Sequence, residues 1–195
     1  MSVAGITSIA LLAILVAVAF VLYVLVVRGS VTIDLGVGRR IRPLGPLTWR
    51  IAAPRDIVFD VVASSYLQRT PRALDQKLRV VERSDDMVLA AHHTPVGPVT
   101  TTTLETVRFE RPERVHFRLT RGPVPHAVEQ FTLHERKDGT ELVYTGELGA
   151  DLWLIGRIWM HFVARSWEAT VRRSLTDVAA EAERQARTVG ARARA

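Results

Sequence analysis

A carboxylate inside a predicted strand is the first group in this sequence whose position suggests chemistry. Glu129 alternates in register with Phe131 and Leu133, and alternate side chains of a strand point to the same face of a sheet. If the two apolar side chains face the core, Glu129 enters it too, where burial raises the pKa of a carboxyl group toward the range useful for a general acid or base. Sheet twist or a bulge would instead turn Glu129 outward, and the sequence leaves both orientations open.

Three further polar residues are candidates for the same interior. His92 and His93 are neighbours on a predicted strand, so their side chains point to opposite faces and cannot share one metal ion. One of the two can face the interior, and we take His92 as that candidate. Thr101 and Thr103 share one face of a Thr-rich strand, where they either line the interior or serve only as good strand residues. No residue in the sequence is identified as catalytic on this basis.

Several other kinds of site lack the residues that they need. The chain has no cysteine, which excludes disulfides, thiolate metal sites and a cysteine nucleophile. An HExxH motif and clustered carboxylates are also absent from the sequence, so we expect no metal. The glycine-rich stretch GVGRR lacks the GK[ST] ending and the following helix of a phosphate loop. We therefore expect no cofactor.

The elements that position these residues indicate an α+β domain. A strand over 47–53 leads into a helix opened by Pro54, with a break near Ser64-Ser65 and a second short helix or turn to Pro71. The pattern then changes to period two, and Asp138-Gly139 is a strong hairpin signal. Six strands are predicted in this part: 77–83, 87–93, 99–109, 115–120, 127–136 and 141–148. Strands in a run followed by one long helix place that helix on one sheet face.

The predicted C-terminal helix begins after Asp151, whose side chain can cap it, and extends to about Arg187. Its lasting apolar stripe consists of Trp153, Met160, Ala164, Trp167, Val171, Leu175 and Val178. The first half carries a second apolar face, formed by Ile155, Trp159 and Phe162. That face needs another apolar surface, which is a cavity, a partner or the bilayer. We expect it to line or gate a pocket.

The order of elements resembles the helix-grip fold of the START-like or SRPBCC superfamily, which includes polyketide cyclase/dehydrase-type and birch-allergen-like proteins. The family's first strand and helix are similar to IAAPRDIVFDVVA (51–63), and its hairpins to RFERPERVHFRL (108–119) and HERKDGTELVYTGEL (134–148). The resemblance covers about residues 47–187 and implies a hydrophobic pocket between the sheet and the C-terminal helix. Pattern and resemblance together give these cavity candidates: His92, Thr101, Thr103, Phe117, Glu129, Phe131, Ile155, Trp159 and Phe162.

The first residues of the chain predict a transmembrane helix. Ile9 to Val27 is an unbroken apolar run, and its length at about 1.5 Å per residue matches a hydrocarbon core of about 30 Å. A cleaved signal peptide is the alternative, but no Lys or Arg precedes the run and cleavage after Ala19 would leave an apolar end. The predicted organisation is an anchor over 1–28, a Gly/Pro/Arg linker over 29–46, the domain over 47–188 and a basic tail over 189–195.

Charge favours an anionic membrane surface over nucleic acid as the partner. The formal net charge is +6, and no aromatic residues are interleaved with basic ones as in RNA-binding proteins. Arg28, Arg39, Arg40 and Arg42 follow the apolar run closely. Because Arg-rich flanks stay on the cytoplasmic side, we expect a single-pass membrane protein whose domain faces the cytoplasm.

Taken with the resemblance, these features predict a membrane-anchored protein that binds a lipid or other hydrophobic small molecule in an internal cavity. The alternative is a polyketide cyclase/dehydrase-like enzyme that uses acid–base residues of the same cavity. A third possibility is a scaffold protein whose interior is filled by its own side chains and has no binding or catalytic role. Convergence of titratable groups inside the cavity would favour catalysis, and a purely apolar lining would favour binding. The sequence makes no prediction of the oligomeric state.

Overall fold

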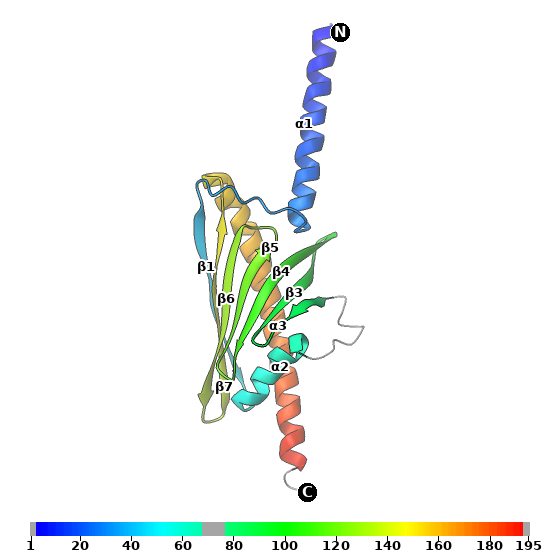
Figure 1. The fold of residues 1–195 in the computed structure, drawn as a ribbon. Coiled ribbons are helices and arrows are strands. Elements are labelled where there is room, and N and C mark those ends of the chain that lie inside the picture. The colour runs from blue at the N-terminus through cyan, green and yellow to red at the C-terminus, as the bar shows by residue number, and fades with distance from the viewer. Residues whose placement is uncertain (1–2, 68–76, 193–195) are drawn as a thin grey trace.

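A computed structural model describes residues 3–67 and 77–192. The elements follow in the order α1 (Val3–Val27), β1 (Arg40–Ile51), α2 (Arg55–Leu67), β2 (Leu78–Arg83), β3 (Met87–Val96), β4 (Val99–Glu110), β5 (Arg114–Arg121), β6 (His126–Arg136), β7 (Gly139–Ala150) and α3 (Trp153–Arg192). The sheet has seven strands in the order β1-β7-β6-β5-β4-β3-β2, and every pair is antiparallel. This confirms the predicted helix-grip α+β fold, in which the sheet curves around α3 (Figure 1).

The core lies between the concave face of the sheet and one side of α3. α3 packs on β1 and β7 and against α2, which covers part of β6 and β7. The α3 side chains that face this core are spaced by multiples of about one turn, and Met160, Ala164, Leu175 and Ala182 are buried. The predicted stripe is therefore confirmed over most of its length. Trp153 is the exception, because it stands at the first residue of α3 and is 56% exposed.

The predicted linker over 29–46 is too long, because β1 begins at Arg40. Pro43 and Pro46 suggested an irregular segment, but β1 is an edge strand, where missing backbone N–H groups are tolerated on the free side. A register shift between Leu44 and Leu47 accommodates the Gly-Pro step. Leu44 is buried in the core, so the domain itself begins before residue 47. At the other end α3 continues to Arg192, into the predicted basic tail.

Two local predictions about helices are also wrong. α2 is continuous to Leu67, so Ser64-Ser65 does not break it; the Ser64 hydroxyl donates to the Val61 carbonyl within the helix. The predicted second helix or turn lies mostly outside the described residues. Asp151 does not cap α3, because its carboxylate accepts hydrogen bonds from the backbone of Leu35 and Gly36 and from Arg39.

The segment between α1 and β1 is fastened to the domain at three places. The Arg28 carbonyl accepts a hydrogen bond from the Thr102 backbone (3.0 Å). The Thr32 hydroxyl donates to the Gly122 carbonyl (2.8 Å) and accepts from the Gly122 N–H (3.0 Å). Asp151 holds the third place, through Leu35 and its neighbours. The segment is thus bound to the domain rather than free, and we call residues 28–39 the strap.

Helix α1 stands away from the domain (Figure 1). Among the described residues, Gly5–Val27 is the one helical stretch that is long and apolar enough to cross a membrane, with a mean hydropathy of 3.2. Only 6% of that stretch is buried within the protein, which distinguishes it from a core helix. Its last turn meets the domain, where Val26 is buried and the Tyr23 ring lies 6.2 Å from the Trp159 ring.

Candidate functional site

Buried polar side chains gather on the concave face of the sheet. Along β4, Thr101, Thr103 and Glu105 alternate with more exposed residues and are all buried. Because β3 and β4 pair with His92 opposite Thr103, the histidine lies beside this row. Glu129 on β6 is buried as well. The period-two pattern thus turns both carboxylates toward α2 and α3.

His92 and Glu105 form an ion pair in this interior. The His92 Nδ1 atom lies 3.2 Å from Glu105 Oε2, and the Thr103 hydroxyl donates to Glu105 Oε1 at 2.6 Å. The second ring nitrogen of His92 lies 3.0 Å from the Tyr66 hydroxyl on α2. When His92 is protonated, both of its ring nitrogens are donors, so Nε2 donates to Tyr66 while Nδ1 faces the carboxylate.

The pKa directions agree with a charged pair. Burial opposes the charge on His92, but the Glu105 carboxylate outweighs burial, and the pKa of His92 is raised above its usual value. Burial alone would raise the pKa of Glu105, yet His92 and the hydrogen bond from Thr103 hold that pKa below its usual value. Both directions favour the charged forms, an imidazolium on His92 and a carboxylate on Glu105.

Glu129 behaves differently, because no cation among the described residues contacts it. The Tyr144 hydroxyl and the Trp167 Nε1 atom both donate to Glu129 Oε1, the latter at 2.5 Å. Burial, followed by the charge of Glu105, raises the pKa of Glu129 to about 7, although the two hydrogen bonds favour its charged form. Opposite Glu129, β7 carries Gly146, where a Cβ atom would lie 3.1 Å from Glu129 Cγ. Glycine thus leaves room for the carboxylate.

The two buried carboxylates, Glu105 and Glu129, therefore differ in how readily they take up a proton. Glu105 is held charged by His92, whereas Glu129 exchanges a proton near neutral pH. A group with such a pKa, placed in an interior with little water, is suited to donate or accept a proton, or to bind a polar group of a ligand. Among the described residues, no three His, Asp or Glu side chains are placed to hold a metal ion.

Aromatic rings surround the polar groups. Tyr66, Phe117, Phe131 and Tyr144 form a continuous row with ring centroids 5.1 to 6.1 Å apart. Tyr66 also contacts the His92 ring, with a centroid distance of 5.8 Å. The interior therefore combines an apolar wall with a few polar atoms, as small-molecule sites commonly do.

Six sequence-predicted candidates are brought together here, and three are not. His92, Thr101, Thr103, Phe117, Glu129 and Phe131 all lie on the concave face. Ile155 and Phe162 are wrong as cavity residues, because they are 69% and 63% exposed on the outer side of α3. Trp159 lies between them and the interior, and its Nε1 atom donates to the Pro123 carbonyl at 2.8 Å.

Sequence reasoning missed four residues of the site: Tyr66, Glu105, Tyr144 and Trp167. Glu105 was available from the pattern, since it continues the spacing of Thr101 and Thr103. Trp167 was assigned to the core stripe of α3, which is correct, but its N–H group reaches Glu129 only because the helix crosses the sheet there. Tyr66 depends on how α2 packs, which no local pattern specifies.

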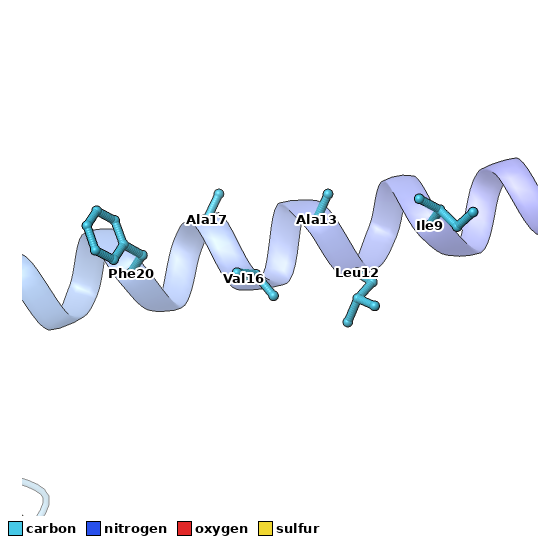
Figure 2. Close-up of a pocket in the computed structure, with 6 residues that line it drawn as sticks. All are labelled: Ile9, Leu12, Ala13, Val16, Ala17 and Phe20. Atoms are coloured by element: carbon cyan, nitrogen blue, oxygen red, sulfur yellow. The ribbon is translucent and has the colours of Figure 1, made fainter.

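Two hollows in the described residues lie elsewhere. One, of about 610 Å³, follows the outer surface of α1 and is lined by Ile9, Leu12, Ala13, Val16, Ala17 and Phe20 (Figure 2). It is a groove of a single exposed helix rather than an enclosed cavity. The other, of about 360 Å³, is a polar surface hollow that includes Arg55, Glu113 and Arg136. The internal hydrophobic pocket implied by the resemblance thus stays a prediction.

Comparisons with known proteins bear on the fold. A family model described as "Polyketide cyclase / dehydrase and lipid transport" matches residues 47–183. A comparison with curated proteins gives no match.

Three solved structures are similar to the domain. The Zhui aromatase/cyclase from Streptomyces sp. R1128 has a TM-score of 0.61 and 19% identity, covering 78% of this chain and 98% of that chain. The di-domain ARO/CYC BexL from the BE-7585A biosynthetic pathway has a TM-score of 0.61 and 16% identity, covering 75% of this chain but only 50% of its own. Ara h 8.0201 has a TM-score of 0.50 and 10% identity, covering 77% and 99%. These similarities confirm the START-like helix-grip fold. Because the identities are 19% or lower, they show the fold alone.

Proposed function

Because the chain belongs to the polyketide cyclase/dehydrase and lipid transport family, we propose that it is a membrane-anchored protein that binds a hydrophobic small molecule between the sheet and α3. The rings of Phe117, Phe131 and their neighbours would contact the apolar body of this ligand. Glu129 and the Tyr66–His92–Glu105 group would contact a hydroxyl or carbonyl group on it. The anchor α1 would keep the site close to a source of apolar molecules.

The observation that carries this proposal is the set of buried titratable groups inside a ring-lined interior. Replacing buried ionic groups with well-packed apolar residues is often neutral or stabilising, so the fold alone has little need of Glu105, His92 and Glu129. Charged groups buried together at one place are typical of binding and catalytic sites. The two hollows described above lie outside this interior, so the proposal depends on the buried groups and not on either hollow.

Native mass spectrometry of the full chain released from detergent micelles tests this function. We expect a hydrophobic molecule to remain bound after the detergent is stripped. A Thr101→Phe variant places a ring in the interior and should lose this molecule, whereas Thr100→Phe, at an exposed position of the same strand, should retain it. A full chain that carries no molecule, or equal retention by both variants, would refute the proposal.

Proton-transfer catalysis on a carbonyl compound is a second candidate, and the Glu129 pKa of about 7 favours it. A carboxylate with this pKa removes a proton from carbon more effectively as the pH rises through 7. The exchange of the C3 methylene protons of acetylacetone for deuterium, followed by NMR, measures that step directly. We expect the full chain to accelerate exchange and Glu129→Gln to abolish the acceleration, with Glu147→Gln at the surface as the control. Acceleration that persists in Glu129→Gln would remove Glu129 from this role.

The orientation of the protein in the membrane is part of the proposal. The cluster of Arg28, Arg39, Arg40 and Arg42 follows α1 directly, which supports a cytoplasmic domain. Protease added to intact cells should then leave the domain uncut, and cutting should begin only after the cells are opened. Digestion of the domain in intact cells would reverse the orientation.

A further inference from the structure

The outer side of α3 at its start is an apolar surface. Trp153, Leu154, Ile155, Ile158 and Phe162 are each more than half exposed, although the buried side of the same turns already packs into the core through Met160 and Ala164. Single exposed apolar residues are common, but a contiguous group of large ones marks an interaction surface. The second half of α3 has no such group, since its exposed positions there are mostly charged or polar.

The strap that connects α1 to β1 extends this surface. Leu35 and Val37 on the strap and Ile41 at the start of β1 are exposed. The strap lies against the start of α3, where the backbone N–H of Leu152 donates to the Val37 carbonyl at 2.8 Å. The Trp153 ring covers Gly38, where an added Cβ atom would lie 2.3 Å from the ring. We call the exposed apolar residues of the first three turns of α3 and of the strap the docking face.

The charges beside the docking face all have one sign along α3. Residues 152–167 contain Arg157, His161 and Arg165 and no Asp or Glu. Both arginines are exposed, as are Arg28 and Arg40 at the two ends of the strap. Basic residues beside an apolar surface match the headgroups of anionic lipids, since each cation near such a surface contributes roughly a fivefold change in the binding equilibrium.

The docking face lies at the end of the domain where α1 joins it. α1 rises from the end of the domain at which α3 begins, while the C-terminal half of α3 leaves the opposite end (Figure 1). The contact between the Tyr23 and Trp159 rings joins the last turns of α1 to the first turns of α3. A bilayer crossed by α1 is therefore the nearest large apolar surface to the docking face.

We propose that the docking face inserts into the headgroup layer of the bilayer that α1 crosses, as a second membrane contact that fixes the orientation of the domain. The proposal rests on α1 as the membrane anchor and is independent of any ligand. A second copy of the chain is a poorer occupant, because a twofold interface would bring the same arginines face to face. Aromatic and apolar side chains with a basic border are the composition of surfaces that lie in the membrane interface.

Site-specific quenching of the full chain in nanodiscs, at one chain per disc, tests this contact. Because the chain has no cysteine, single variants Ile155→Cys and Phe162→Cys accept a fluorophore without background labelling. Thr176→Cys, exposed on the second half of α3, is the matched control, and Ala13→Cys reports on α1. Lipids brominated on the acyl chain supply the quencher. We expect strong quenching at 13, 155 and 162 and little at 176.

The lipid composition then tests the basic border. Quenching at 155 should increase when phosphatidylglycerol replaces part of the phosphatidylcholine, and the double variant Arg157→Gln, Arg165→Gln should weaken this increase. Quenching at 13 with labels at 155 and 162 no more quenched than the label at 176 would overturn the docking and leave the anchor intact. An unquenched label at 13 would overturn both. Either result leaves ligand binding to be judged by the mass spectrometry experiment alone.

Discussion

The interior around Glu129 and the docking face at the start of α3 are opposites in composition. The interior holds Glu105, His92 and Glu129, although ionisable side chains seldom lie inside proteins. The docking face holds Ile155 and Phe162 outside, although large apolar groups seldom gather on the surface of a monomer. Neither the buried ionisable groups nor the exposed apolar side chains stabilise the fold by themselves. The difference is the basis of the two proposals above, a ligand for the interior and a bilayer for the docking face.

Removal of one aromatic ring from each region should give the largest contrast. Phe117 is buried in the ring row, so Phe117→Ala should lower the free energy of unfolding by about 3–5 kcal/mol. Phe162→Ala removes an exposed ring and should change it by less than about 0.5 kcal/mol. Urea unfolding of the full chain in detergent, followed by circular dichroism, measures both. Similar losses in the two variants would mean that Phe162 belongs to the core.

Removal of one histidine from each of two ion pairs should separate interior from surface charge. His92→Leu leaves Glu105 buried without its cation, and we expect a loss of about 3 kcal/mol. His126 pairs with Glu147 at the surface, at 2.8 Å, and His126→Leu should cost less than about 1 kcal/mol. The same unfolding assay applies. A His92→Leu variant as stable as the His126→Leu variant would show that solvent reaches Glu105.

Glu129 should make stability depend on pH. Its pKa is raised to about 7 in the folded protein, so the folded state binds a proton more tightly than the unfolded state. The resulting stabilisation is complete below the unfolded pKa of about 4.3 and is lost as the pH rises through 7, by roughly 3 kcal/mol at most. Glu129→Gln should remove this decline, and the difference between the two proteins should grow from pH 5 to about pH 7 and then stay constant. Parallel pH profiles would contradict the buried, uncharged carboxyl.

Replacement of Asp151 should have the smallest effect on stability, with a pH dependence opposite to that of Glu129. Its hydrogen bonds with Arg39, Gly36 and Leu35 hold the pKa of Asp151 at about 2, so the stabilisation is present above pH 4 and is lost as the pH falls toward 2. Asp151→Asn should cost about 1–2 kcal/mol at pH 7 and little at pH 2. Thermal unfolding at the two pH values checks this. A cost that is equal at both would show that packing, not charge, holds the strap.

The strand pattern and the inward row of β4 and β6 could be predicted because a strand has a period of two. The register of Glu129 with Phe131 and Leu133 made it a candidate for the interior but left its orientation open, and in the structure it is buried. The start of β1 was missed because Pro43 and Pro46 resemble loop residues, and only the sheet order shows that β1 is an edge. Asp151 was misjudged because its partners are more than a hundred residues away in the chain.

The apolar start of α3 shows a different limit. The sequence correctly gave Ile155 and Phe162 a face apart from the stripe, but of a cavity, a partner and a bilayer it favoured the cavity. The choice depends on the direction of that face relative to the sheet and to α1, which is a property of the tertiary structure. The pairing of His92 with Glu105 likewise depends on the register of β3 and β4.

The clamped strap has a mechanical consequence. A flexible linker of twelve residues would let a domain move up to roughly 40 Å away from the end of α1. The hydrogen bonds of the strap with Thr102, Gly122 and Asp151 prevent this separation. The domain is thus held next to the last turn of α1, so that a tilt of α1 would move the domain with it.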